Sequence, residues 1–176
     1  MASHAAFLRG MNVGGHRISN AELIELFVGL GFGDVQAFRA SGNVAFSAEA
    51  SAATLARSIE QGLQAALGYA VPTFLRTAAE LRKIAAASPF GAEQAGGRPQ
   101  VALLSRRADA AARREVLALA GENERLTFAG RELHWLPSAG VLGSELDLAL
   151  VEARLGPITL RTKGTIELFA ARSFGG

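Results

Sequence analysis

The chain has 176 residues, of which 49% are hydrophobic and 19% are charged, a composition typical of a folded chain with one domain or two small ones. It contains no cysteine, which excludes disulfides, thiolate nucleophiles and zinc–sulfur sites. The 18 basic and 16 acidic side chains give a net charge of +2, which is small for a protein whose whole surface attracts nucleic acid. No apolar run approaches the roughly 20 residues of a membrane-spanning helix, and the sequence begins without a signal-peptide pattern. We therefore expect a cytoplasmic protein with no membrane partner.

The first half of the chain predicts elements in the order β-α-β-β-α-β. The apolar segment HAAFL predicts a strand that runs into the glycine-rich loop GMNVGGHRI, and Ser19 with Glu22 has the capping-box spacing that begins a helix. The segments DVQAFRA and NVAFS, separated by SG, predict two strands and a tight turn. A helix over 51–67 that ends at Gly68, followed by a strand in VPTFLR, completes the order.

The second half predicts a related unit that is modified at its end. The segment QVALLS predicts a strand, 109–120 a helix, and RLTFAG with RELHWLP a hairpin that turns near Gly130. Ser144 with Asp147 predicts the cap of a helix that ends at Leu155. The segment GPITLRTKGTIELFAA predicts a loop that enters a C-terminal helix, so the last strand of this unit is expected to be replaced or obscured.

Three stretches of the chain resemble a known family. FLRGMNVGGHRIS, AELIELFVGLGFGDVQAFRASGNVAF and ITLRTKGTIELF are similar to the bacterial domain-of-unknown-function 1697 family, and the resemblance covers nearly the whole chain. The specific positions are Arg9, Gly10, Asn12, Gly14, Gly15, Ser41, Gly42, Asn43, Thr159, Arg161 and Thr165. The resemblance implies two α-β plait (ferredoxin-like) units, and it assigns no catalytic residues, because the family has no assigned activity. Its pattern favours Arg-Asn-Trp-Asn-Thr near the C-terminus, where this chain has RTKGT over 161–165, so an aromatic and two amides are replaced.

We therefore predict an α+β protein with two α-β plait units, 1–78 in the order β-α-β-β-α-β and 79–176 in a modified form. In the plait order 4-1-3-2, the first and third strands are adjacent, central and antiparallel. The loop after the first strand, which begins at Arg9, is then expected beside the turn that precedes the third strand. These two polar loops are expected to form one surface.

The composition of these loops favours an anionic ligand. No carboxylate occurs before Glu22 or between Val35 and Ala48, whereas several basic side chains lie in those stretches. Glycines ahead of a helix let backbone amides approach an anion, and an arginine offers a planar fork to phosphate. The predicted ligand-binding residues are Arg9, Asn12, Gly14, Gly15, His16, Arg17, Arg39, Ser41, Gly42, Asn43 and Arg161.

The preferred hypothesis is a non-catalytic module that binds a phosphate-bearing ligand, which includes nucleic-acid phosphate. An alternative is an enzyme that acts on a phosphorylated small molecule and uses His16 or an unplaced carboxylate for proton transfer. A further alternative is an oligomerising structural protein, because the second unit's missing strand would leave a sheet edge for a second copy. A purely structural interpretation also stands, in which the glycines make a tight connection and the asparagines bond only to turn backbone.

Several other sites lack their required residues. The segment from Gly10 has His16 and Arg17 where a nucleotide-binding P-loop needs lysine and then serine or threonine, and no G-x-G-x-x-G fingerprint follows a strand. The histidines share no metal-ligand spacing, so we predict no metal and no cofactor. For nucleic acid, the aromatic run of RNA-binding plaits is absent, and the remaining signal is a small basic cluster formed by Arg106, Arg107, Arg113 and Arg114.

Overall fold

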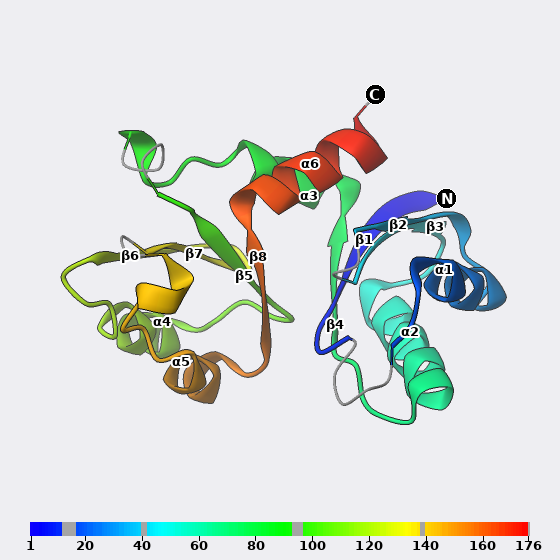
Figure 1. Ribbon diagram of the computed structural model, residues 1–176, viewed down its shortest axis with the longest axis horizontal. Coiled ribbons are helices and arrows are strands. Elements are labelled where there is room, and N and C mark those ends of the chain that lie inside the picture. The colour runs from blue at the N-terminus through cyan, green and yellow to red at the C-terminus, as the bar shows by residue number, and fades with distance from the viewer. Residues whose placement is uncertain (12–16, 40–41, 93–96, 138–139, 176) are drawn as a thin grey trace. The chain divides into compact units, whose positions relative to one another are not determined.

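The protein is described here from a computed structural model of residues 1–176, and the structure describes all of them except 12–16, 40–41, 93–96, 138–139 and 176 (Figure 1). The chain forms two compact units, one of Met1–Ile84 with Phe169–Gly176 and one of Ala85–Leu168. The described residues form two four-stranded antiparallel sheets and six α-helices, which confirms the α+β class.

The sheet of the first unit has the strand order β2-β3-β1-β4. Its strands are β1 (Ala2–Leu8), β2 (Gly33–Phe38), β3 (Asn43–Ala48) and β4 (Thr73–Thr77). Its helices between strands are α1 (Asn20–Gly29), between β1 and β2, and α2 (Ala52–Leu67), between β3 and β4. The central strands β1 and β3 are antiparallel, with Ala2 opposite Ala48 and Phe7 opposite Asn43. The end of β1 therefore lies beside the beginning of β3.

Local signals in the sequence explain where the helices of the first unit begin and end. Ser19 and Glu22 form the predicted capping box, in which the Glu22 amide donates to the Ser19 hydroxyl at 3.2 Å and the Ser19 amide donates to the Glu22 carboxylate at 2.7 Å. Gly68 ends α2 in the left-handed conformation, with φ of 80°. These interactions fix the helix ends without help from the rest of the fold.

The two faces of the first sheet bury different groups. Alternate residues of the strands pack with α1 and α2 into an apolar core that includes Ala6, Leu8, Leu23, Phe27, Val44, Phe46, Ile59, Leu63 and Leu75. The other face carries Phe7, whose ring meets that of Phe169 edge-on, with 5.7 Å between the ring centres. The ring of Phe38 stacks on that of Phe169, with 5.2 Å between the centres. Phe169 belongs to the C-terminal helix α6 (Lys163–Phe174), so residues late in the sequence complete this unit.

The second unit repeats the element order of the first. Its sheet has the order β6-β7-β5-β8, formed by β5 (Gln100–Leu104), β6 (Glu124–Ala129), β7 (Glu132–Pro137) and β8 (Ile158–Thr162). Its other elements are α4 (Ala110–Leu117), the 3-10 helix η2 (Val141–Gly143) and α5 (Leu148–Leu155). The predicted hairpin turns at Gly130, whose φ is 61°. The core includes Ala102, Leu104, Val116, Leu133, Trp135, Val151 and Leu155.

Two predictions for the second unit are wrong. The segment expected to be a loop is the strand β8, which pairs with β5 and places Arg161 opposite Val101. The last strand is therefore present and pairs with β5, so that side of the sheet ends at β8 and not at β5. Ser144 does not cap α5, because Asp147 is the cap and accepts from the amides of Ala149 and Leu150. The Ser144 hydroxyl instead donates to Glu124 at 2.5 Å.

The fourth strand of each unit runs directly into a helix. β4 continues into α3 (Ala78–Ala86), and β8 continues into α6. A threonine stands at each junction: the Thr77 hydroxyl accepts from the Glu80 amide at 3.2 Å, and that of Thr162 accepts from the Thr165 amide at 3.1 Å. Each junction follows the same three residues, Leu-Arg-Thr, so the two units share a short sequence repeat at equivalent places.

Among the helices of the described residues, none combines the length and the apolar character that crossing a membrane requires.

Candidate ligand-binding surface

The end of β1 and the turn before β3 are in direct contact. The Leu8 amide donates to the Gly42 carbonyl at 2.8 Å. Gly42 has φ of 70°, and a Cβ added there would lie 3.0 Å from Leu8 Cβ and 3.1 Å from Met11 Cγ. Glycine is therefore required by both the backbone conformation and the close approach. In the described residues, the end of β1 and Met11 of the loop that follows it therefore lie beside Gly42.

Two arginines stand at strand ends close to this contact in the sequence, one after β1 and one after β2. Arg9 follows Leu8, and its amide donates to the Pro72 carbonyl at 3.0 Å. Arg39 follows β2 with φ of 58°, and its guanidinium lies 5.5 Å from the centre of the Phe38 ring. Arg17 and Arg39 are exposed, and neither is within ion-pair distance of a carboxylate in the described part of the chain. Both guanidinium groups can therefore accept an external anion.

Asn43 has an internal role. Its side chain is fully buried, and its amide donates to the Phe38 carbonyl at 3.3 Å. This bond ties the beginning of β3 to the end of β2 across the turn. Asn43 therefore positions the loops, and it does not present its amide to solvent.

The predicted residues Asn12, Gly14, Gly15, His16 and Ser41 lie outside the residues that the structure describes. Arg161 lies on β8 of the second unit. Its guanidinium donates to the Thr159 hydroxyl and the Leu160 carbonyl, each at 2.9 Å. Burial lowers the pKa of Arg161 to about 10. These bonds give Arg161 a role in holding the end of β8.

Sequence reasoning missed Arg76, the counterpart of Arg161 on β4. Its side chain is 1% exposed, and it donates to the Leu75 carbonyl at 2.7 Å, as Arg161 does to Leu160. The shared Leu-Arg-Thr triplet is the signal that could have paired these two arginines. A fully buried arginine is rare in globular proteins, which indicates a defined position for Arg76 in its sheet, whereas Arg161 is half-buried.

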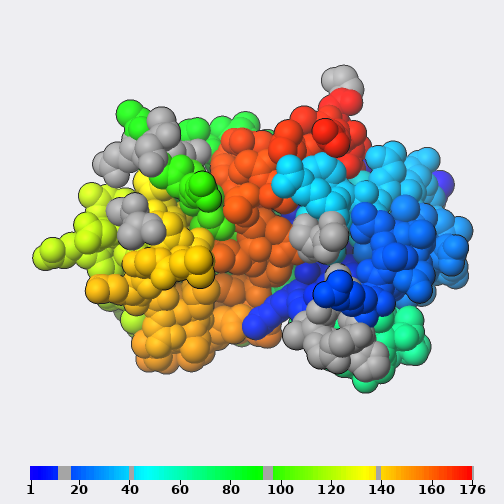
Figure 2. Space-filling view, in the orientation of Figure 1, coloured from blue at the N-terminus to red at the C-terminus, as the bar shows by residue number. Residues whose placement is uncertain are grey.

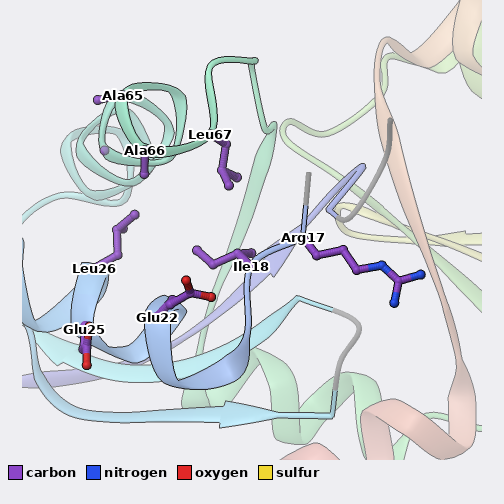
Figure 3. Close-up of a pocket in the computed structure, with 9 residues that line it drawn as sticks. Arg17, Ile18, Glu22, Glu25, Leu26, Ala65, Ala66 and Leu67 are labelled. Carbon is purple, nitrogen blue, oxygen red and sulfur yellow. The ribbon is translucent and has the colours of Figure 1, made fainter. Parts of the chain in front are cut away.

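A second feature, absent from the sequence predictions, is a hollow of about 810 Å³ between α1 and α2, which we call the α1–α2 slot (Figure 3). Its apolar walls include Ile18, Leu26, Ala66 and Leu67. Gly62 of α2 also lines the slot, and the blue atoms of Figure 2 show that α1 lies at the surface. A Cβ on Gly62 would lie 3.3 Å from the Leu30 methyl groups, so glycine allows the two helices to approach here.

Three charged residues also line the slot, and their side chains point in different directions. Figure 3 shows the Glu22 carboxylate turned into the slot, below Ile18, whereas Arg17 extends away from it and Glu25 points outward. Hydrogen bonds from the Ser19 amide and hydroxyl lower the pKa of Glu22, which keeps its carboxylate ionised at neutral pH. The charged group that faces into the slot, the Glu22 carboxylate, is therefore negative.

One of the four arginines in the basic cluster of the second unit makes hydrogen bonds within the fold. Arg113 donates to the carbonyls of Ala108 and Gly130, each at 3.1 Å, and lies 5.2 Å from the Phe128 ring centre. Arg106, Arg107 and Arg114 are exposed. Arg113 therefore holds the hairpin, which leaves three arginines facing solvent.

Among the described residues, no group of three histidine, aspartate or glutamate side chains is placed to hold a metal ion.

The fold and these sites define an α+β protein with two four-stranded antiparallel sheets. A family model described as a protein of unknown function (DUF1697) matches residues 1–134, and the chain belongs to this family, as its motifs predict. The matched residues end within β7, so the Arg161 segment lies beyond them.

Among solved structures, the chain is similar to the conserved bacterial protein SP0830 from Streptococcus pneumoniae, with 21% identity and a TM-score of 0.78 over 98% of each chain. This likeness shows the fold. No curated protein matches the chain.

Proposed function

We propose that the protein binds an anionic, phosphate-bearing ligand where the loop after β1 meets the turn before β3, and that it does so without catalysing a reaction. The observation that carries this proposal is the bond from the Leu8 amide to the Gly42 carbonyl, at 2.8 Å. It brings together two loops that are more than thirty residues apart in the sequence and that both carry arginine.

Electrostatics supports an anion at this place. No carboxylate occurs in residues 1–21 or 35–48, which hold both loops. Arg17 and Arg39 are exposed and make no ion pair within the described residues, so binding an anion breaks no existing ion pair there. Their planar guanidinium groups match the geometry of phosphate oxygens.

The helix N-terminus contributes less than the arginines. The carboxylate of Glu22 already occupies the start of α1, where it accepts from the Ser19 amide. A second negative charge at that end would be repelled by Glu22. The arginines are therefore the proposed ligand contacts, with Gly42 and Asn43 shaping the surface.

We further propose that both units are α-β plaits of the ferredoxin-like type. Each has the element order β-α-β-β-α-β, and each places its first and third strands side by side at the centre of the sheet. This topology is what brings the loop after β1 against the turn before β3.

A thermal-shift screen tests the function with phosphate, sulfate, nucleotides, sugar phosphates, and short RNA and DNA. A ligand at about 100 times its dissociation constant stabilises the native state by about 2.7 kcal/mol. We expect a phosphate-bearing compound to raise the midpoint of the wild type, and the Arg17→Gln, Arg39→Gln double variant to lose that shift. Arg57→Gln, which removes an exposed charge from α2 in the same unit, is the matched control and should keep it.

Equal shifts in the wild type and in the double variant would exclude this site. Chemical conversion of a bound phosphate compound, followed by phosphorus NMR, would contradict the non-catalytic part of the proposal and favour an enzyme. A shift with RNA or DNA only would identify the ligand as nucleic-acid phosphate.

A further inference from the structure

The α1–α2 slot has the size of a small-molecule site. Its volume of about 810 Å³ lies within the range of about 300 to 1,000 Å³ that ligand pockets occupy. Ile18, Leu26 and Leu67 give it apolar walls, and the small side chain of Ala66 leaves the space open. Such pockets usually combine an apolar body with a few polar groups that orient the ligand.

Glu22 supplies the orienting group. Both hydrogen bonds from Ser19 end on the same carboxylate oxygen, Oε2, each at 2.7 Å. The other oxygen, Oε1, accepts no hydrogen bond from the described residues. An ionised carboxylate has about four acceptor positions, so Glu22 keeps the capacity to bind a further donor.

The charges around the slot select the sign of the ligand. In Figure 3, Glu22 faces the slot while Arg17 turns away from it, and within the described residues Glu22 forms no ion pair. A charged donor forms a shorter and stronger hydrogen bond to a carboxylate than a neutral donor does, so the exposed Glu22 carboxylate favours a protonated amine.

We propose that the α1–α2 slot binds a small organic cation, in which an apolar body fills the slot and a protonated amine donates a hydrogen bond to Oε1 of Glu22. This site differs from the proposed anion site in the groups that contact the ligand: Glu22 and the helix walls here, Arg17, Arg39 and the Gly42 turn there. Arg17 lines the slot but turns away from it, so it borders both sites. The two proposals take ligands of opposite charge, and each can fail alone.

Three probes of similar shape test the ligand class on the full chain: phenethylamine, phenethyl alcohol and 3-phenylpropionate. Two-dimensional NMR follows the amides of Ile18, Leu26 and Ala66 during titration. We expect phenethylamine to bind with a dissociation constant of about 1 mM or below, and the alcohol at least about tenfold more weakly, because a carboxylate bonds a charged donor more strongly than a neutral one. The carboxylate probe should not shift these amides.

Matched variants test the residues. Glu22→Gln keeps the capping box, because glutamine serves at that position, but it removes the charge, so phenethylamine should bind at least about tenfold more weakly. Glu25→Gln removes a charge that also lines the slot but points outward, so it should weaken binding clearly less than Glu22→Gln does. Ala66→Leu fills the slot from an exposed helix position and should abolish binding, whereas Ala53→Leu, exposed near the other end of α2, should not.

Equal affinity for the amine and the alcohol would overturn the proposal, as would equal effects of the Glu22 and Glu25 variants. Binding that survives in a folded Ala66→Leu variant would place the ligand elsewhere. An absence of amide shifts with phenethylamine at about 10 mM would show that the slot takes no such cation.

Discussion

The carboxylate of Glu124 accepts a hydrogen bond from the indole N–H of Trp135, and both side chains are buried in the core region of the second unit. Its other oxygen accepts from the Ser144 hydroxyl at 2.5 Å, and that hydroxyl in turn accepts from the Leu146 amide at 3.0 Å. One carboxylate thereby ties the hairpin of β6 and β7 to the segment that leads into α5.

Replacing Glu124 with alanine should destabilise the protein by about 3 kcal/mol, because the buried Trp135 N–H and the Ser144 hydroxyl lose their acceptor. Urea unfolding measured by the fluorescence of Trp135 reports the change, since this is the only tryptophan in the sequence. Glu122→Ala removes a neighbouring exposed carboxylate and should change stability by less than about 0.5 kcal/mol. Similar losses in both variants would contradict a specific role for Glu124.

Gly42→Ala should destabilise the first unit by about 2 kcal/mol or more, because its Cβ would meet Leu8 at 3.0 Å while φ is 70°. Gly31→Ala is the matched control: its φ is 86°, but no atom lies within 4 Å of the added Cβ, so only the backbone strain of about 1 kcal/mol applies. Thermal or urea unfolding compares the two. The close approach of the loops would be disproved if Gly31→Ala cost as much as Gly42→Ala.

Both His4 and His134 should titrate below the usual value of about 6.5. Burial is the main cause in each case; the positive charge of Lys163 lowers the pKa of His134 further, whereas Glu80 and the backbone of Ala48 partly offset the effect at His4. Proton NMR titration of the imidazole C–H resonances measures the two midpoints, and a midpoint above 6.5 would contradict the prediction for that residue.

These lowered pKa values make the native state favour the neutral imidazoles. The unfolded chain binds more protons once the pH falls below about 6.5, so stability should decrease from pH 7 towards each native midpoint and then stop changing through these groups. A His4→Gln, His134→Gln double variant should show a flatter dependence between about pH 7 and 5.5. An equally steep dependence in that variant would assign the effect to other groups.

Lys163→Met should raise the pKa of His134 towards its usual value, because the Lys163 charge is one of the two causes that lower it. Lys163 is 4% exposed, and its ammonium group donates to the Ala85 carbonyl and to Glu167. Losing these bonds should also cost about 1 to 3 kcal/mol of stability. The readout is the His134 midpoint by NMR in the folded variant, and an unchanged midpoint would show that the two side chains are not coupled.

Local signals predicted most of the fold, because they act between residues close in sequence. The capping pair at Ser19 and the turn at Gly130 need no information from the rest of the chain. β8 was missed for the opposite reason: it has only five residues, and α6 begins at the next residue, so no turn residue marks the boundary. Its strand conformation depends on pairing with β5, which begins fifty-eight residues earlier.

The candidate sites, too, could be predicted only where a feature followed from local sequence or from the strand order. The contact between the β1 loop and the Gly42 turn could be expected from topology, because it follows from the pairing of β1 with β3. The burial of Asn43 could not be expected, since asparagine next to a turn is usually a surface residue. The α1–α2 slot also left no local signal: Glu22 and Ala66 are forty-four residues apart, and Glu22 in sequence indicates only a helix cap.

The ring of Phe169 packs on Phe7 and Phe38, and this places a limit on the order of folding during synthesis. A ribosome makes the chain from the N-terminus, so β1, β2 and all of the second unit are translated before Phe169 emerges. While the second unit is synthesised, Phe7 and Phe38 on one face of the first sheet therefore lack their contact with Phe169. At a translation rate of about 5 to 20 residues per second, that interval lasts several seconds, during which the nascent first unit is a natural substrate for chaperones.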